Sequence, residues 1–176
     1  WIRAGPGYQV HLDTVVGLPI ATMFSRRMSS DGELTPQGLR PLFYDEETKV
    51  AFRDARRATL HFEADAVRLT SGQRAAAPAA VQDSVSQFVQ LAYLFAIRPG
   101  LLEPGTSIEV PLALPRHVST WTYRVEGIDT VYTDFGAIDA VHLRPQPGAA
   151  RPGDLMAELW VAPRLRYLPV RLRIRQ

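Results

Sequence analysis

The sequence has 176 residues, of which 46% are hydrophobic and 22% are charged, and it contains no cysteine. These proportions fit one globular domain and exclude a disordered chain, which would be poorer in apolar residues. The 20 basic and 18 acidic residues leave a net charge of only +2, so the composition does not favour nucleic acid as a partner. Without cysteine there are no disulfides and no thiol catalysis, and no run of about 18 apolar residues predicts a transmembrane helix.

Alternating apolar and polar residues predict strands in the first 70 residues. The segment from Gly7 to Val16, with Tyr8 and Val10 at alternate positions, is typical of a half-buried strand. Further strands are expected at 21–28, 58–63 and 66–70, with a loop from Gly32 to Pro41 and an alanine-rich surface loop at 71–81. The short connections favour antiparallel pairing.

One helix is predicted in the middle of the chain. Asp83 is a suitable N-cap for a helix over residues 84–97, and the pair Pro99-Gly100 would end it. From Phe88 onward nearly every residue is apolar, which is typical of a helix enclosed by protein. We therefore expect a sheet to wrap this helix.

Strand patterns resume after the helix and continue to the end of the chain. The predicted strands are 107–114, 117–126, 130–135, 137–144, 155–162 and 167–175, with an exposed loop from Pro145 to Asp154. No change in composition divides the sequence. We expect a single, mainly β domain over residues 1–176, in which a curved antiparallel sheet of about ten strands, a half-barrel or open barrel, wraps one inserted helix at about residues 84–97.

The residues that could carry chemistry form no enzyme motif. His61, Glu63 and Asp65 alternate along a predicted strand and could hold a metal, but the apolar residues between them favour a solvated polar face. No Gly-x-Ser-x-Gly nucleophile elbow is present. We expect no enzyme activity, metal or cofactor. A hydrolase is the third alternative, and it would need His117 or His142 beside a carboxylate in a cleft.

Four aromatic side chains are candidates for binding an apolar ligand. Trp121 and Tyr123 share one face of a predicted strand, and Tyr93 and Phe95 lie on the predicted helix. Amphipathic aromatics can line the pocket of a barrel-like sheet, where a lipid or another apolar small molecule would bind. Packing in the core is the alternative role for the same residues.

Three arginines are candidates for binding an anionic partner. Arg171, Arg173 and Arg175 alternate with apolar residues on the last predicted strand, so they share one face. Such a face could engage an envelope protein or an anionic polysaccharide. The alternative is the ordinary charged outer face of a one-sided antiparallel sheet.

Several segments resemble one protein family. The loop Ser30–Pro41 and the pair Glu158–Pro163 and Tyr167–Leu172 are similar to the DUF3108 family of proteobacterial exported proteins, over about residues 8–174. The family has no assigned biochemical activity. The resemblance implies export to the periplasm and a mainly β architecture akin to the half-barrels of lipoprotein carriers. Since family members begin with a strand ahead of the region matching Gly7–Val16, we expect this chain to lack that strand.

Two functional hypotheses follow. The first is a periplasmic, non-enzymatic binding protein of the cell envelope that holds a hydrophobic or amphipathic ligand on the concave side of the sheet. The second is a structural or interaction protein that engages an envelope protein or anionic polysaccharide through a sheet edge or through the three arginines.

Overall fold

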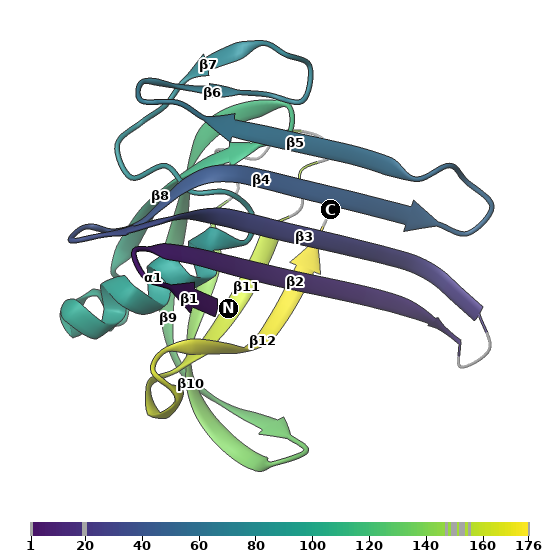
Figure 1. Cartoon of the computed structure of the whole chain (residues 1–176). Coiled ribbons are helices and arrows are strands. Elements are labelled where there is room, and N and C mark those ends of the chain that lie inside the picture. Colours follow the sequence, from purple (N-terminus) through teal and green to yellow (C-terminus); the bar gives the residue numbers. More distant parts are fainter. Residues whose placement is uncertain are drawn as a thin grey trace. The chain divides into compact units, whose positions relative to one another are not determined.

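The structure is a computed structural model that describes residues 2–18, 21–146, 148, 151, 154 and 156–175 (Figure 1). Within these residues the chain forms twelve strands and one α-helix, α1 (Ser86–Ile97). No helix in this part of the chain is long and apolar enough to cross a membrane. The prediction of a mainly β protein with one inserted helix is confirmed.

The first sheet holds the strands of the N-terminal half in sequence order, each paired antiparallel with the next. They are β1 (Ile2–Ala4), β2 (Gly7–Leu18), β3 (Ala21–Thr35), β4 (Gly38–Val50), β5 (Arg56–Phe62), β6 (Ala66–Arg68) and β7 (Arg74–Ala76). The short strand β1 pairs antiparallel with the start of β2. The long strands β2 to β5 lie side by side in Figure 1.

Two regions predicted as loops contain strands. Residues 32–41 form the end of β3, a tight turn and the start of β4. The turn is short because the Thr35 hydroxyl donates to the Gly38 carbonyl at 3.0 Å and Gly38 takes a φ of 111°, which glycine adopts readily. In the predicted loop 71–81, the segment Arg74–Ala76 pairs with β6 and forms β7.

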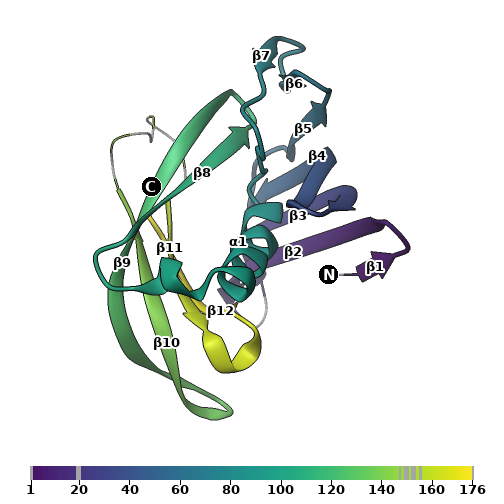
Figure 2. The ribbon, with the colours of Figure 1, turned by 90° about the vertical axis from the view of Figure 1, so that its left-hand side faces the viewer.

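The second sheet contains the strands of the C-terminal half. Its order is β12 (Leu168–Arg175), β11 (Met156–Ala162), β10 (Gly136–Pro145), β9 (His117–Thr133) and β8 (Ser107–Leu114). Figure 2 shows β9 and β10 as a long curved pair. The described strands therefore form two sheets and no closed barrel, rather than one sheet of about ten strands.

The sequence predicted two separate strands over residues 117–126 and 130–135, but β9 is one continuous strand with a bulge. His142 pairs with Gly127 and Leu143 pairs with Val125, which leaves Glu126 as an extra residue on β9. Gly127 takes a φ of 143° there, and the strand continues to Thr133. Of the predicted loop from Pro145 to Asp154, most residues lie outside the described part of the chain.

The chain divides into two compact units. The first comprises Trp1–Gln87 and Pro111–Ser119, and the second comprises Phe88–Val110 and Thr120–Gln176. In the second unit Leu91 and Phe95 of α1 are buried, and the Phe95 ring packs edge-on against Tyr167 with centroids 6.1 Å apart. The sequence predicted a helix enclosed along its whole length. The last turn differs, because Ile97 is 54% exposed there.

A buried polar network fixes the start of α1 in the first unit. Asp83 Oδ1 accepts hydrogen bonds from the backbone N–H groups of Val85 and Ser86, at 2.9 and 2.8 Å, as an N-cap does. Asp83 Oδ2 accepts one from the Ser30 hydroxyl at 2.6 Å, and Ser30 accepts one in turn from the Tyr8 hydroxyl at 3.1 Å. The predicted cap is confirmed, and it also ties the helix start to β2 and β3.

Candidate functional site

The aromatic residues predicted to bind a ligand lie mainly in the interior of the second unit. Trp121, Tyr123 and Phe95 are buried, and Tyr93 is half-buried. Burial raises the pKa of the Tyr123 hydroxyl far above its ordinary value of 10. These side chains pack as core residues do, which is the alternative role that the sequence left open.

Two of the predicted arginines lie together on the second sheet. Arg171 and Arg173 are exposed on β12, and their guanidinium carbons lie 4.9 and 5.4 Å from the ring centroid of Trp160. Trp160 is on the neighbouring strand β11 and pairs directly with Arg171. This is cation–π geometry, and it places both guanidinium groups over one indole. Arg175 pairs with Met156, but its side chain lies outside the described part of the chain.

The Trp160 ring is held from two further directions. Its Nε1 donates a 2.8 Å hydrogen bond to Asp129 Oδ2, and the His142 ring stacks on it with centroids 4.3 Å apart and planes within 10°. The two arginines, the stacked imidazole and the sheet leave the indole only 3% exposed. The ring is thus a fixed platform beneath Arg171 and Arg173.

His142 lies between two carboxylates. Glu158 Oε1 accepts a 2.8 Å hydrogen bond from His142 Nε2, and Asp129 Oδ2 lies 3.4 Å from His142 Nδ1. Arg144 and Arg173 each place a guanidinium nitrogen 3.6 Å from a carboxylate oxygen of Glu158. His142 and Glu158 are both buried, so each compensates the desolvation of the other.

This cluster places His142 beside carboxylates, as the hydrolase alternative requires. Both nitrogens of the His142 ring face carboxylates, whereas a nucleophile activated by a base needs a hydroxyl or thiol within hydrogen-bond reach of the base. His142 is buried, with 7% of its surface exposed. His117 is buried as well and belongs to the first unit.

The candidate metal residues on β5 and the following turn form other contacts instead. Glu63 makes ion pairs with Arg68 at 2.9 Å and Arg74 at 2.6 Å, and the hydrogen bond from Arg68 lowers the pKa of Glu63. Asp65 also lies 3.4 Å from Arg74, and the His61 ring lies beside Phe43. Across the described residues, no three His, Asp or Glu side chains are arranged to hold a metal ion.

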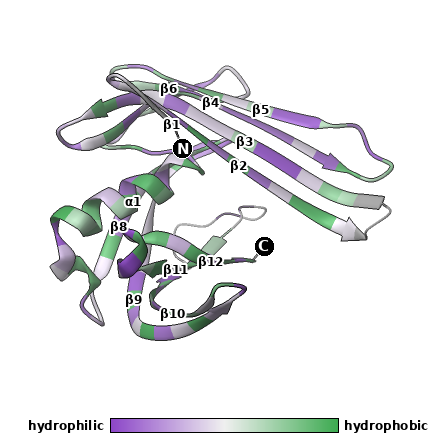
Figure 3. Ribbon diagram, turned by 60° about the horizontal axis from the view of Figure 1, so that its bottom comes forward, coloured by the Kyte–Doolittle hydropathy of each residue, from purple (hydrophilic) through white to green (hydrophobic). Residues whose placement is uncertain are grey.

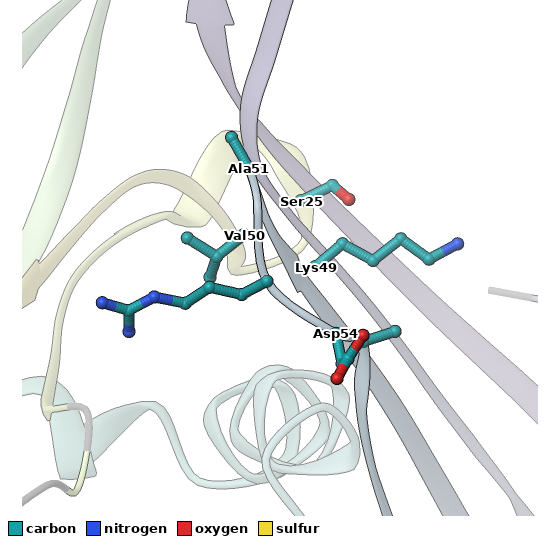
Figure 4. Close-up of a pocket in the computed structure, with 7 residues that line it drawn as sticks. Ser25, Lys49, Val50, Ala51 and Asp54 are labelled. Carbon is teal, nitrogen blue, oxygen red and sulfur yellow. The ribbon is translucent and has the colours of Figure 1, made fainter.

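A depression of about 600 Å³ lies at one end of the first sheet (Figure 4). It is lined by Ser25 of β3 and by residues 49–51 and 53–55, which include Lys49, Arg53 and Asp54. The lining mixes charged residues with the apolar Val50, Ala51 and Ala55, and it contains none of the residues predicted to bind a ligand. Sequence patterns did not indicate this depression, because it depends on the β4–β5 turn.

Comparisons with known proteins agree with the resemblance seen in the sequence. The model of one family, described as a protein of unknown function (DUF3108), matches residues 2–176. No curated protein and no solved structure matches the chain. Since the family model covers almost the whole sequence, the chain belongs to the DUF3108 family.

Proposed function

We propose that this protein is a non-enzymatic binding protein of the cell envelope, located in the periplasm, that engages an anionic partner. The proposed contact is the arginine face, by which we mean Arg171 and Arg173 over the Trp160 ring. The observation that carries the proposal is that two exposed guanidinium groups lie within 5.4 Å of the centroid of one buried indole. The periplasmic location rests on the family resemblance.

Fixed arginines favour binding because less side-chain freedom is lost when the partner arrives. Trp160 is anchored by its hydrogen bond to Asp129 and by the stacked His142 ring, so the surface under the arginines is rigid. Arg173 has only a long contact of 3.6 Å with Glu158. Its guanidinium N–H groups therefore retain donors that carboxylate or sulfate oxygens can accept.

The position of β12 favours a protein over a polysaccharide as the partner. β12 is the last strand in the order of the second sheet, so its outer edge has no strand neighbour among the described residues. An extended segment could add to this edge through backbone hydrogen bonds and place acidic side chains against Arg171 and Arg173. Leu172 between the two arginines and Ile174 after them are also exposed, so the fitting sequence alternates acidic and apolar residues.

The carrier hypothesis has less support from the geometry. Trp121, Tyr123 and Phe95 are buried, and the depression described above includes Lys49, Arg53 and Asp54 in its lining and none of the predicted aromatic residues. Ligand pockets are mainly apolar concave sites, so neither region has the expected character. The arginine face is therefore the better candidate for a binding surface.

Binding can be measured by the fluorescence anisotropy of a labelled peptide in which Glu and Val alternate, with labelled polygalacturonate as the polysaccharide arm. The double variant Arg171→Gln, Arg173→Gln should weaken peptide binding about tenfold or more. The control, Arg164→Gln with Arg166→Gln, removes the same charge from the exposed turn between β11 and β12. Equal loss in both double variants, or binding that does not weaken as salt rises, would contradict the proposal.

A further inference from the structure

Exposed apolar side chains gather at the end of the first sheet where β4 turns into β5. We call this group the apolar tip; it consists of Val15, Val16, Met23, Val50 and Phe52, which are 39% to fully exposed. The pairing brings them to one end of the sheet, because Val16 and Val50 both pair with Phe24, and the Ala51 N–H donates to the Met23 carbonyl at 2.9 Å. Figure 1 shows the β4–β5 turn at the end of the sheet where β2 ends and β3 begins.

Phe52 is the most prominent member of the apolar tip. Its side chain is fully exposed, and its φ of 62° lies in the left-handed region that a bulky residue rarely adopts. Val16 and Val50 share one face of the sheet through their common partner Phe24, whereas Val15 lies on the opposite face. Exposed apolar side chains grouped at one end of a sheet can mark a contact site for a protein or a membrane.

The β4–β5 turn of the apolar tip carries a local excess of positive charge. Residues 49–57 include four cations, Lys49, Arg53, Arg56 and Arg57, and one carboxylate, Asp54, so this segment carries +3, against +2 for the whole chain. Glu47 forms ion pairs with Lys49 and Arg57. Arg53 and Arg56 are exposed and have no ion pair within the described residues. In Figure 3 the final part of β2 is hydrophobic in colour and the beginning of β5 is hydrophilic.

We infer that the apolar tip binds the surface of an anionic phospholipid bilayer, with Phe52 entering the interface and Arg53 and Arg56 contacting lipid phosphates. Apolar side chains with exposed arginines next to them match such a surface in both respects, because acyl chains bury the apolar atoms and anionic headgroups attract the cations. The depression lined by Lys49 and Arg53 opens beside the same turn and could receive a headgroup (Figure 4).

The chain contains a matched control in the β9–β10 hairpin of the second unit. Phe135 is 97% exposed at the turn of that hairpin, and Tyr132 beside it is 85% exposed. The charged neighbours there are carboxylates, Asp129, Asp134 and Asp139. This hairpin therefore presents the same aromatic group with the opposite charge, and an anionic bilayer should repel it.

The inference can be tested by co-sedimentation with vesicles of phosphatidylglycerol and phosphatidylethanolamine, with phosphatidylcholine vesicles as the neutral comparison. Phe52→Ser should lower the partition coefficient about tenfold or more, and Arg53→Gln with Arg56→Gln about 25-fold. Phe135→Ser, and Arg164→Gln with Arg166→Gln, should leave it unchanged. Raising the salt from about 0.1 M to about 1 M should release the wild type, because the Debye length falls from about 10 Å to about 3 Å.

The absence of cysteine allows a second readout at single sites. An environment-sensitive dye on Ala55→Cys, three residues from Phe52, should brighten and shift to the blue on vesicle binding. The same dye on Ala137→Cys, in the control hairpin, should not respond. Equal responses at the two sites, equal binding to phosphatidylcholine, or full binding by Phe52→Ser would overturn the inference. So would self-association of the free protein that Phe52→Ser abolishes, because the apolar tip would then be a contact between chains.

Discussion

Replacing Asp83 by alanine tests whether one carboxylate holds the start of α1 against the first sheet. The substitution removes the acceptor of the Val85 and Ser86 backbone N–H groups and leaves the buried Ser30 hydroxyl without its acceptor at 2.6 Å. Loss of an N-cap costs about 1 kcal/mol, and loss of a hydrogen bond to a charged group costs about 1.5–3 kcal/mol. We expect Asp83→Ala to lower the free energy of unfolding by about 3 kcal/mol.

The assay is urea unfolding followed by tryptophan fluorescence and far-UV circular dichroism. With an m-value of about 2 kcal/mol/M, the midpoint should fall by about 1.5 M. Asp83→Asn is the matched control, because the amide oxygen can still accept the hydrogen bonds of the cap, and it should lose about 1 kcal/mol or less. The reasoning is refuted if Asp83→Ala lies within about 0.5 kcal/mol of the wild type, or if both variants lose the same amount.

Two further predictions concern the first sheet and its buried acid. Gly32→Ala should cost about 2 kcal/mol or more in urea unfolding, because a Cβ there would lie 2.2 Å from the Arg40 carbonyl oxygen, whereas Gly100→Ala, with space around it, should cost little. Burial raises the pKa of Asp83 above its ordinary value of 3.8, because the effect of desolvation is larger than that of the hydrogen bonds, which lower the pKa. Between its unfolded and its raised folded pKa, Asp83 binds more protons in the folded state, so its contribution to the free energy of unfolding falls as the pH rises from about 3.8. Glu47 and Glu63, whose pKa values are lowered, contribute the opposite slope, so the test is the difference between wild type and Asp83→Asn: the wild type should lose stability relative to Asp83→Asn as the pH rises through this range.

Local patterns predicted the elements whose determinants lie within a few residues. The N-cap at Asp83 needed only the residue type and the apolar run after it, and the structure contains it. The alternation of Arg171 and Arg173 likewise placed both on one face of a strand, as the shared Trp160 ring confirms. In both cases the spacing within one element was sufficient.

Features that depend on pairing between distant strands were missed. Gly32 was assigned to a turn, but it lies within β3 and pairs with Tyr8, and the 2.8 Å between its ideal Cβ position and Tyr8 Cε1 leaves no room for a side chain. The contact of His142 with Glu158 depends on the register of β10 against β11, which the intervening loop does not encode in any local pattern. The exposure of Phe52 likewise depends on where β4 ends, because the strand stops at Val50 and leaves Phe52 in the following turn.

Some arginines have a carboxylate partner within the protein and others have none. The arginines without a partner are the better candidates for contact with another molecule. Arg26 donates to Glu46 at 2.6 Å and is mostly covered, so its charge is used inside the first unit. Arg53, Arg56 and Arg171 have no carboxylate partner among the described residues. Arginines without a carboxylate partner thus occur at both proposed contact surfaces, the apolar tip and the arginine face, although the net charge of the whole chain is only +2. A cation paired with a nearby carboxylate attracts an anionic partner less strongly over a Debye length. The two proposals therefore rest mainly on Arg53, Arg56 and Arg171, with Arg173 contributing beside its 3.6 Å contact to Glu158.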